Sequence, residues 1–277
     1  MTNSHASGVN SEPGVEITIR ENPVVASQDR VSAGPVAYVS IDNQRRLNCL
    51  SSPQIIKLIE AFEKLSQRQD LRAVVLTGAG EKSFIGGADL NELGSADVDG
   101  ARLFITRLHQ ACAAIRACPV PVIGRVNGFC LGGGLEVAAS CDMRVASNNA
   151  IFGMPEVHMG LPSVIEAALL PGQIGWGKTR EILLTGETFS ADEALAMGFV
   201  QKVVQMEQLD TVVDNWLAGI LAAAPQAIRS QKALMNHWER VSVDEGVAAG
   251  IDALSDAYKT GEPQVRIGDF FATKAKR

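Results

Sequence analysis

Hydrophobic positions follow two different periods along the first part of the chain. In residues 15–20 (VEITIR) and 36–41 (VAYVSI), apolar and β-branched residues alternate or run together, which predicts two paired strands. A helical period follows. Ser52 is placed as its N-cap and Pro53 at its first helical position, and its apolar face comprises Ile55, Ile56, Leu58, Ile59, Phe62 and Leu65.

The rest of the chain separates into an alternating part and a helical part. Further strands are predicted at 73–76, 121–126, 143–146 and 150–152. Helices are predicted at 101–117, at 135–141, after the capping box at 190–193, and at 208–222, 225–240 and 243–258. Alternation of strands and helices indicates an α/β core. We therefore expect a disordered tail at 1–14, a core with the active site at 15–204, and a helical region at 205–277.

Composition narrows the class of protein. The 277 residues are 46% hydrophobic and 20% charged, which suits a globular protein. A net charge of −6 disfavours a nucleic-acid binder, which needs a basic surface. No apolar run is long enough to span a membrane. The first fourteen residues lack the apolar core of a secretory signal. We expect a cytoplasmic protein that binds neither membrane nor nucleic acid.

Cysteine and histidine positions give no indication of a metal site. The five cysteines include no CxxC pair, and the four histidines are scattered without ligand spacing. Buried free thiols in a reducing compartment are the expected state of the cysteines.

Two glycine-rich stretches follow predicted strands, at 83–90 (SFIGGADL) and 127–136 (NGFCLGGGLE). Each leads into a predicted helix, where backbone N–H groups lack partners and another molecule can approach the glycines closely. Two such N–H groups directed at one point could stabilise an oxyanion. Tight helix packing or a phosphate loop explains either stretch alone. The chain has no GK[ST] and no fitting GxGxxG, which excludes a P-loop and a dinucleotide fingerprint.

Two carboxylates stand in apolar surroundings near the second stretch. Glu136 lies in an otherwise apolar predicted helix, and Glu156 follows a short strand in FGMPE. A buried charge is costly unless it is paired or functional. Two neighbouring carboxyls push their pKa values apart, so that one stays protonated while the other ionises. Such a pair can move protons between carbon and water. Taken singly, each residue is equally well explained as a helix-start charge or an ion-pair partner.

Several motifs occur together in the order typical of one family: IDNQRRLNCL, SFIGGADLNEL, NGFCLGGGLEVAASCDMRVAS, FGMPEVHMG and LLTGETFSADEALAMGFVQKVV. From about residue 15 to 235 the chain resembles the enoyl-CoA hydratase/isomerase (crotonase) family. This resemblance implies a crotonase-like spiral of ββα repeats, with a C-terminal helical region that builds trimers, usually paired into hexamers. It also implies an acyl-CoA substrate and no separate cofactor, because coenzyme A is part of the substrate.

The resemblance also assigns roles to individual residues. It implies an oxyanion hole formed by the N–H groups of Ala88 and Gly133. It implies that Glu136 activates the water and that Glu156 donates the proton. Contacts with coenzyme A would come from Arg45, Leu47, Ile85, Gly86, Asp89, Leu90 and Pro155. Phe271 and Lys274 would reach the coenzyme of a neighbouring subunit.

The implied reaction is addition of water to a 2-enoyl-CoA. The alternatives are a Δ3-Δ2-enoyl-CoA isomerase, another crotonase-type lyase, decarboxylase or thioester hydrolase, and a non-catalytic acyl-CoA-binding scaffold. Hydratases commonly carry a glycine-rich turn after the second glutamate, whereas this chain has bulkier residues at 162–166. Glu166 could add a third carboxyl near the pocket, but a helix-start charge is the favoured interpretation. His158 is interpreted as structural.

Overall fold

Two β-sheets form the framework of the computed structural model, which describes residues 14–20 and 34–275. The larger sheet has the order β1-β2-β3-β5-β7-β10, with strands Gly14–Arg20, Val36–Asp42, Ala73–Gly78, Val122–Val126, Met143–Ser147 and Lys202–Val204. The smaller sheet has the order β4-β6-β8-β9, with strands Ser83–Ile85, Phe129–Leu131, Ile151–Gly153 and Thr188–Ser190. Only β1 and β9 run antiparallel to the strand beside them.

Consecutive strands join the two sheets alternately. β3, β5 and β7 belong to the larger sheet, and the strand after each of them, β4, β6 or β8, belongs to the smaller one. Helices α3 (Val98–Ala117) and α4 (Gly133–Ala139) follow the first two such pairs. The chain therefore winds as a spiral of ββα turns, which confirms the predicted crotonase-like architecture.

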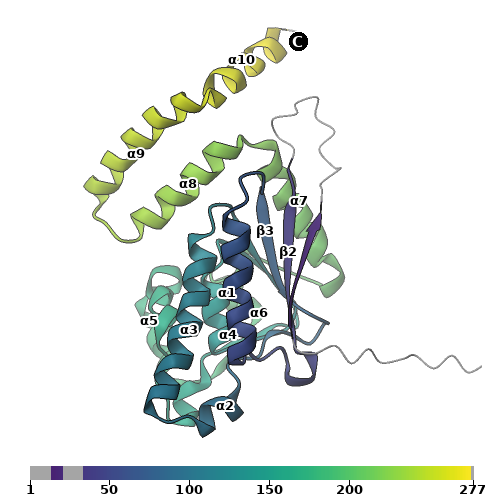
Figure 1. The fold of residues 1–277 in the computed structure, drawn as a ribbon, viewed down its shortest axis with the longest axis vertical. Coiled ribbons are helices and arrows are strands. Elements are labelled where there is room, and N and C mark those ends of the chain that lie inside the picture. Colours follow the sequence, from purple (N-terminus) through teal and green to yellow (C-terminus); the bar gives the residue numbers. More distant parts are fainter. Residues whose placement is uncertain (1–13, 21–33, 276–277) are drawn as a thin grey trace, which may run out of the picture.

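The inner strands of the larger sheet, such as β3 and β5, are buried on both faces, in keeping with their nearly continuous apolar runs. Val74 and Leu76 of β3 belong to the main core with α3 and α1 (Ser52–Ser66), whereas Ala73 and Val75 pack with α7 (Leu209–Ala222). Figure 1 shows α1 and α3 on one side of the strands and α7 on the other. The short helices α2 (Leu90–Ser95) and α6 (Ala191–Ala196) and the longer α5 (Leu170–Thr185) complete this body.

The last helices form an arm that leaves the body. α8 (Pro225–Trp238) turns back from α7, and α9 (Val243–Ala257) packs along it. A 3-10 turn, η5 (Tyr258–Thr260), connects α9 to α10 (Glu262–Ala275). In Figure 1, α9 and α10 lie nearly end to end, away from the sheets. The helical C-terminal region is thus present, although residues 276–277 lie outside the described part.

Several element boundaries differ from the sequence-based prediction. The predicted N-cap Ser52 is wrong: Ser51 is the N-cap of α1, because the Gln54 side chain accepts a hydrogen bond from its N–H at 3.1 Å. Helix α3 begins at Val98 after the Asp97 cap, three residues earlier than predicted. The strands at 15–20 and 36–41 do pair as predicted. Residues 1–13 of the predicted tail lie outside the described residues, and Gly14 already belongs to β1.

Candidate active site

Three neighbouring strand ends of the smaller sheet carry the predicted site. β4, β6 and β8 are parallel, so their carboxyl ends meet at one edge. The segment Gly86–Ala88 follows β4, α4 follows β6, and the 3-10 turn η2 (Pro155–Met159) follows β8. The fold therefore brings together Ala88, Gly133, Glu136 and Glu156, although nearly seventy residues separate the first from the last.

The backbone hydrogen bonds on either side of Ala88 leave its own N–H without an acceptor in the described part of the chain. Leu50 donates to Gly87 O at 2.8 Å, and its carbonyl accepts from Asp89 N at 2.8 Å. These two bonds fix the backbone on both sides of Ala88. No acceptor for the Ala88 N–H occurs in 14–20 or 34–275, so this donor is available to a ligand.

The second donor, Gly133, is the first residue of α4. Gly132 before it has φ +52°, and its N–H donates to Gly153 O at 2.9 Å, which fixes the turn. Gly133 N–H has no acceptor within the described ranges either, as expected at a helix start. A Cβ at Gly133 would lie only 3.9 Å from Ala88 N, so the two backbones are adjacent.

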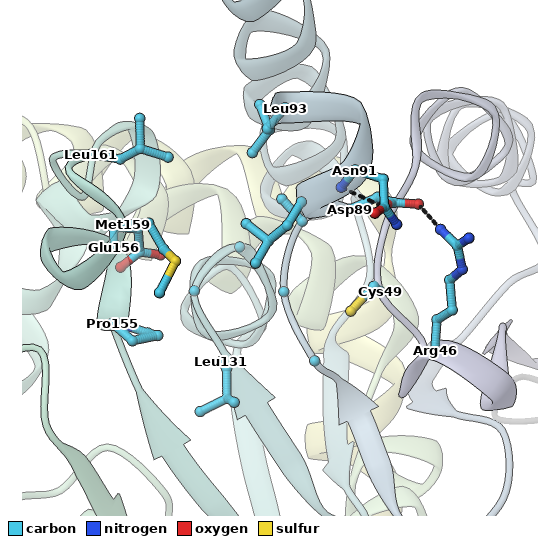
Figure 2. A pocket seen from close by; sticks show the side chains of 16 residues that line it. Arg46, Cys49, Asp89, Asn91, Leu93, Leu131, Pro155, Glu156, Met159 and Leu161 are labelled. Carbon is cyan, nitrogen blue, oxygen red and sulfur yellow. Dashed lines mark hydrogen bonds and ion pairs between the residues drawn. The ribbon is translucent and has the colours of Figure 1, made fainter. Parts of the chain in front are cut away.

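Two cavities meet beside these donors. One has a volume of about 500 Å³ and the other, more apolar, about 400 Å³. Both are lined by Ala88, Leu93, Gly133, Glu156 and Leu161. Figure 2 shows the first cavity, with Arg46 and Asp89 on one side and Glu156, Met159 and Leu161 on the other. A ligand that extends through both cavities would pass these common residues at the junction. We therefore take the junction as the candidate position of the reacting atoms.

Glu136 faces the more apolar cavity from inside α4. Its side chain is 3% exposed, and its Oε1 accepts a hydrogen bond from Ala167 N at 3.1 Å. Burial raises the pKa of Glu136 to about 9, and the carboxyls of Glu156 and Glu166 add to the rise against the opposing effect of that hydrogen bond. Glu136 is therefore protonated at neutral pH.

Glu156 lines both cavities and is only partly buried. Ser163 Oγ donates a hydrogen bond to its Oε2 at 2.8 Å, which holds the carboxyl at the edge of the cavities. A Cβ at position 132 would come within 2.6 Å of Glu156 Oε1, so glycine at 132 keeps this carboxylate in place. The two glutamates thus lie in different environments: Glu136 is buried with a backbone N–H as its partner, and Glu156 is half-buried with the Ser163 hydroxyl as its partner.

The residues predicted to contact coenzyme A divide into two groups. Gly86, Asp89, Leu90 and Pro155 line the 500 Å³ cavity, whereas Arg45, Leu47 and Ile85 are outside the lining of both cavities. Ile85 is fully buried and packs against α4, and the Leu47 carbonyl accepts from Gly86 N at 2.8 Å. These two support the cavity wall rather than form it. Phe271 and Lys274 lie on α10, exposed and also outside both linings.

Sequence reasoning missed several lining residues. Arg46, next to the predicted Arg45, lines the cavity and pairs with Asp89 at 2.7 Å between Nη1 and Oδ2. Cys49, Met159 and Leu161 line it as well. The signal for Arg46 was its place in the same motif, but two successive residues with positive φ, Leu47 and Asn48, reverse the chain there.

The structure also revises the favoured interpretation of Glu166. Its carboxyl is 5% exposed, and its Oε1 lies 2.9 Å from His109 Nδ1. It is therefore a buried, paired acid rather than a simple helix-start charge. His158 Nε2 lies 2.8 Å from Thr185 O, a contact between η2 and the end of α5. Within the described ranges there is no His, Cys, Asp and Glu cluster suited to a metal ion, and no helix is long and apolar enough to cross a membrane.

The fold and the site define a protein of the crotonase class, and comparison with known sequences gives the family. The family model "Enoyl-CoA hydratase/isomerase" matches residues 32–270. Since this match covers most of the chain, the protein belongs to the enoyl-CoA hydratase/isomerase family.

Individual relatives agree with that assignment. The chain is 35% identical over 228 residues to a short-chain-enoyl-CoA hydratase of Clostridium acetobutylicum, covering 82% of this chain and 87% of the relative. It is 32% identical over 241 residues to a crotonyl-CoA hydratase of Syntrophomonas wolfei, covering 87% and 91%. The crystal structure of an enoyl-CoA hydratase from Bacillus anthracis superposes with a TM-score of 0.82 at 30% identity, covering 87% and 93%. The predicted hydratase class is confirmed.

Proposed function

We propose that this enoyl-CoA hydratase adds water to the double bond of short, apolar 2-enoyl-CoA thioesters. The proposal is carried by one observation: two N–H groups without an acceptor in the described part of the chain and two carboxyls lie where two cavities meet. The short acyl chain is supported by the relatives named above and by the apolar lining of the smaller cavity, which includes Phe104, Ile105, Leu108 and Val164.

The N–H groups of Ala88 and Gly133 would bind the thioester oxygen. As negative charge grows on that oxygen, two fixed donors lower the barrier, each by about 3–4 kcal/mol in comparable sites. They also polarise the conjugated double bond, so that its β-carbon becomes open to attack by water. The pantetheine arm would then lie in the 500 Å³ cavity, along Gly86, Leu90 and Pro155.

The proton order that we propose reverses the one implied by the resemblance. Burial favours a resting proton on Glu136, whereas Glu156 is half-buried and lines both cavities, where it can contact the attacking water. Glu156 would accept a proton from water as the hydroxyl adds to the β-carbon, while Glu136 gives its own proton to the α-carbon. One proton has then moved from Glu136 to Glu156, and exchange with solvent restores the pair. Because the pair is coupled, its pKa values belong to both residues.

We also propose that the chain assembles with further copies of itself, as a trimer or hexamer. α9 and the first residue of η5 present an exposed apolar row at helical spacing, formed by Val243, Val247, Ile251, Leu254 and Tyr258. Each of these side chains is at least 52% exposed in the single chain. Such a continuous apolar surface on an arm is typical of a protein interface.

A thioester panel tests the reaction. Purified protein is mixed with crotonyl-CoA, longer 2-enoyl-CoA thioesters and 3-enoyl-CoA thioesters, and the conjugated chromophore and products are followed. We expect loss of the chromophore with 2-enoyl substrates and a 3-hydroxyacyl product. Formation of the chromophore from 3-enoyl substrates would indicate the isomerase instead.

Two substitutions test the carboxyl pair. Glu136→Gln and Glu156→Gln should each lower kcat for hydration by at least about 10²-fold, since each removes one partner of the proton transfer. Glu60→Gln, on the exposed side of α1, is the matched control and should keep wild-type activity. Full hydration by both site variants would refute the two-carboxyl mechanism.

A further inference from the structure

Glu166 is a third buried carboxyl close to the active site, outside the roles assigned above. It belongs to the 3-10 turn η3 (Ile165–Leu169), in the segment that replaces the usual glycine-rich turn. Its Oε1 pairs with His109 Nδ1 at 2.9 Å, whereas its Oε2 is buried without a hydrogen-bond partner in the described part of the chain. A buried acid with one unsatisfied oxygen destabilises the fold, and its presence therefore needs an explanation such as a functional role.

The turn that carries Glu166 also holds Glu136. Ala167, the next residue, donates its N–H to Glu136 Oε1 at 3.1 Å. Ile165, the preceding residue, has φ +38°, a left-handed conformation that a β-branched residue rarely adopts. Such a conformation persists only where surrounding contacts hold it. The contact between Glu166 and His109 is one that fixes the turn in this shape.

His109 connects this buried turn to solvent. It lies on α3, and its side chain is 53% exposed, against 5% for Glu166. It follows Leu108, which lines the apolar cavity. The pair therefore spans from the surface of α3 to the turn that contacts Glu136.

The ionisable groups around Glu166 come from the elements packed against η3. α4 contributes Glu136, and α3 contributes His109 and Cys112. Burial, reinforced by Glu166 and Glu136, raises the pKa of the Cys112 thiol, so that it stays neutral. The ionisable residues of α5, Lys178, Arg180 and Glu181, are exposed. Glu156, on η2, is the other carboxyl that acts on Glu136. Among these groups, His109 is the one in contact with the Glu166 carboxyl.

We propose that Glu166 and His109 form a positioning pair for hydration: they fix the turn whose Ala167 N–H orients Glu136, and they hold a third carboxyl beside it. This inference rests on the proposed hydration by Glu136 and Glu156. Neither residue of the pair lines the 500 Å³ cavity, so they act on the chemical step and not on coenzyme binding.

The test compares kcat, KM and the pH profile of kcat/KM for crotonyl-CoA in wild type, Glu166→Gln and Glu166→Asp. Glu166→Gln removes the negative charge but keeps the shape, so Glu136 loses its proton more easily. The alkaline limb of the pH profile of kcat/KM should therefore move to lower pH by at least ~0.5 unit. We expect kcat to fall about tenfold and KM to stay within about twofold of the wild-type value. Glu166→Asp keeps the charge but shortens the reach, so kcat should fall while the limb stays in place.

His109 and the controls complete the design. His109→Gln keeps a hydrogen-bond donor for Glu166 in place of the imidazole ring, so kcat should fall less than in Glu166→Gln. His237→Gln on α8 and Glu60→Gln on α1, both exposed, should match wild type in every parameter. A purely structural role would lower the melting temperature without moving the alkaline limb.

The outcomes separate this inference from the proposed function. If wild type hydrates no 2-enoyl-CoA, the proposed function fails. The other case is that wild type hydrates crotonyl-CoA and Glu136→Gln does not. If Glu166→Gln and His109→Gln then match wild type in kcat and in the alkaline limb of the pH profile, only the positioning pair is refuted. Should Glu166→Gln fail to fold, the Glu166→Asp and His109→Gln profiles still decide.

Discussion

At the scale of single residues, the carboxyl of Glu136 is buried inside a helix whose seven residues are all buried. Its negative charge would have to form away from water and near two other carboxyls. The raised pKa, about 9, measures how strongly the folded protein resists that charge. The unfolded chain has no such resistance, and its glutamate ionises near the ordinary value of 4.5. Between these pH values, only the folded state holds the proton.

This difference makes the stability of the wild type depend on pH. A raised carboxyl pKa contributes stability that is complete below pH 4.5 and decreases as pH rises towards 9, by up to ~1.4 kcal/mol per pH unit. Glu136→Gln removes this dependence. The variant should therefore melt at nearly the wild-type temperature at pH 5 and several degrees higher at pH 8.5. Calorimetry at both pH values checks this, and an equal difference at the two would contradict it.

The sequence alone could predict the main site residues, because local rules and motif order both point to them. Glu136 and Glu156 stand in apolar segments, and Ala88 and Gly133 follow glycine-rich turns. The partner of Glu166 could not be predicted this way. His109 is 57 residues distant along the chain, and a contact between two separate elements leaves no trace in the period of either.

At the scale of elements, the two proposed oxyanion donors depend on how closely α4 approaches β4. A Cβ on Gly134 would lie 2.2 Å from Ile85 O and 2.8 Å from Ile85 Cβ, closer than real contacts allow. Glycine at 134 therefore lets the helix start lie directly on the strand end. That approach keeps the N–H groups of Ala88 and Gly133 side by side.

Gly134→Ala should separate these two elements. We expect a loss of ~2–4 kcal/mol in the free energy of unfolding and a fall in kcat of about 10²-fold, because displaced donors no longer match the thioester oxygen. Denaturant unfolding and the crotonyl-CoA assay measure the two effects. Gly219→Ala on α7, where a Cβ meets nothing within 4 Å, is the control and should be neutral or slightly stabilising. A fully active, stable Gly134→Ala would refute the account.

Elements with a clear period were predicted well and the others were not. The strong apolar faces of α1, α7 and α9 fixed those helices to within one or two residues. α5 was missed because it contains Gly175 at φ +78°, where the helix is kinked and its apolar face is interrupted. α10 lies in the region 205–277 that was predicted to be helical, but its bounds were not predicted, since its apolar residues stay exposed in the single chain and no core imposes a pattern on them.

At the scale of the whole molecule, the division into two sheets could not be predicted from periodicity. β4, β6 and β8 have three residues each, too few for a period to appear. Their arrangement was predicted from the family resemblance, and the structure confirms it. The long strands of the larger sheet, in contrast, were evident from their apolar runs.

The exposed apolar row on the helical arm allows a prediction about assembly. Ile251→Glu and Leu254→Glu together place two charges in the apolar row of α9. In the single chain, Ile251 is 66% exposed and Leu254 is 67% exposed. We expect the double variant to dissociate to monomer, because buried unpaired charges disfavour an interface. Light scattering after size-exclusion chromatography gives the mass. Leu184→Glu on α5, an equally exposed leucine on the body, should leave the mass unchanged. A monomeric wild type would overturn the proposed assembly.

The position of β10 at the edge of the larger sheet has a consequence for synthesis on the ribosome. β10 pairs with β7, yet roughly fifty-five residues of chain separate the two strands. At 5–20 residues per second, translation of that interval takes about 3–11 s. During this time β7 has an unpaired edge, and unpaired edges are templates for association between chains. Lower growth temperatures slow translation and lengthen that interval. A chaperone that binds nascent chains would shield the edge of β7 until β10 pairs with it.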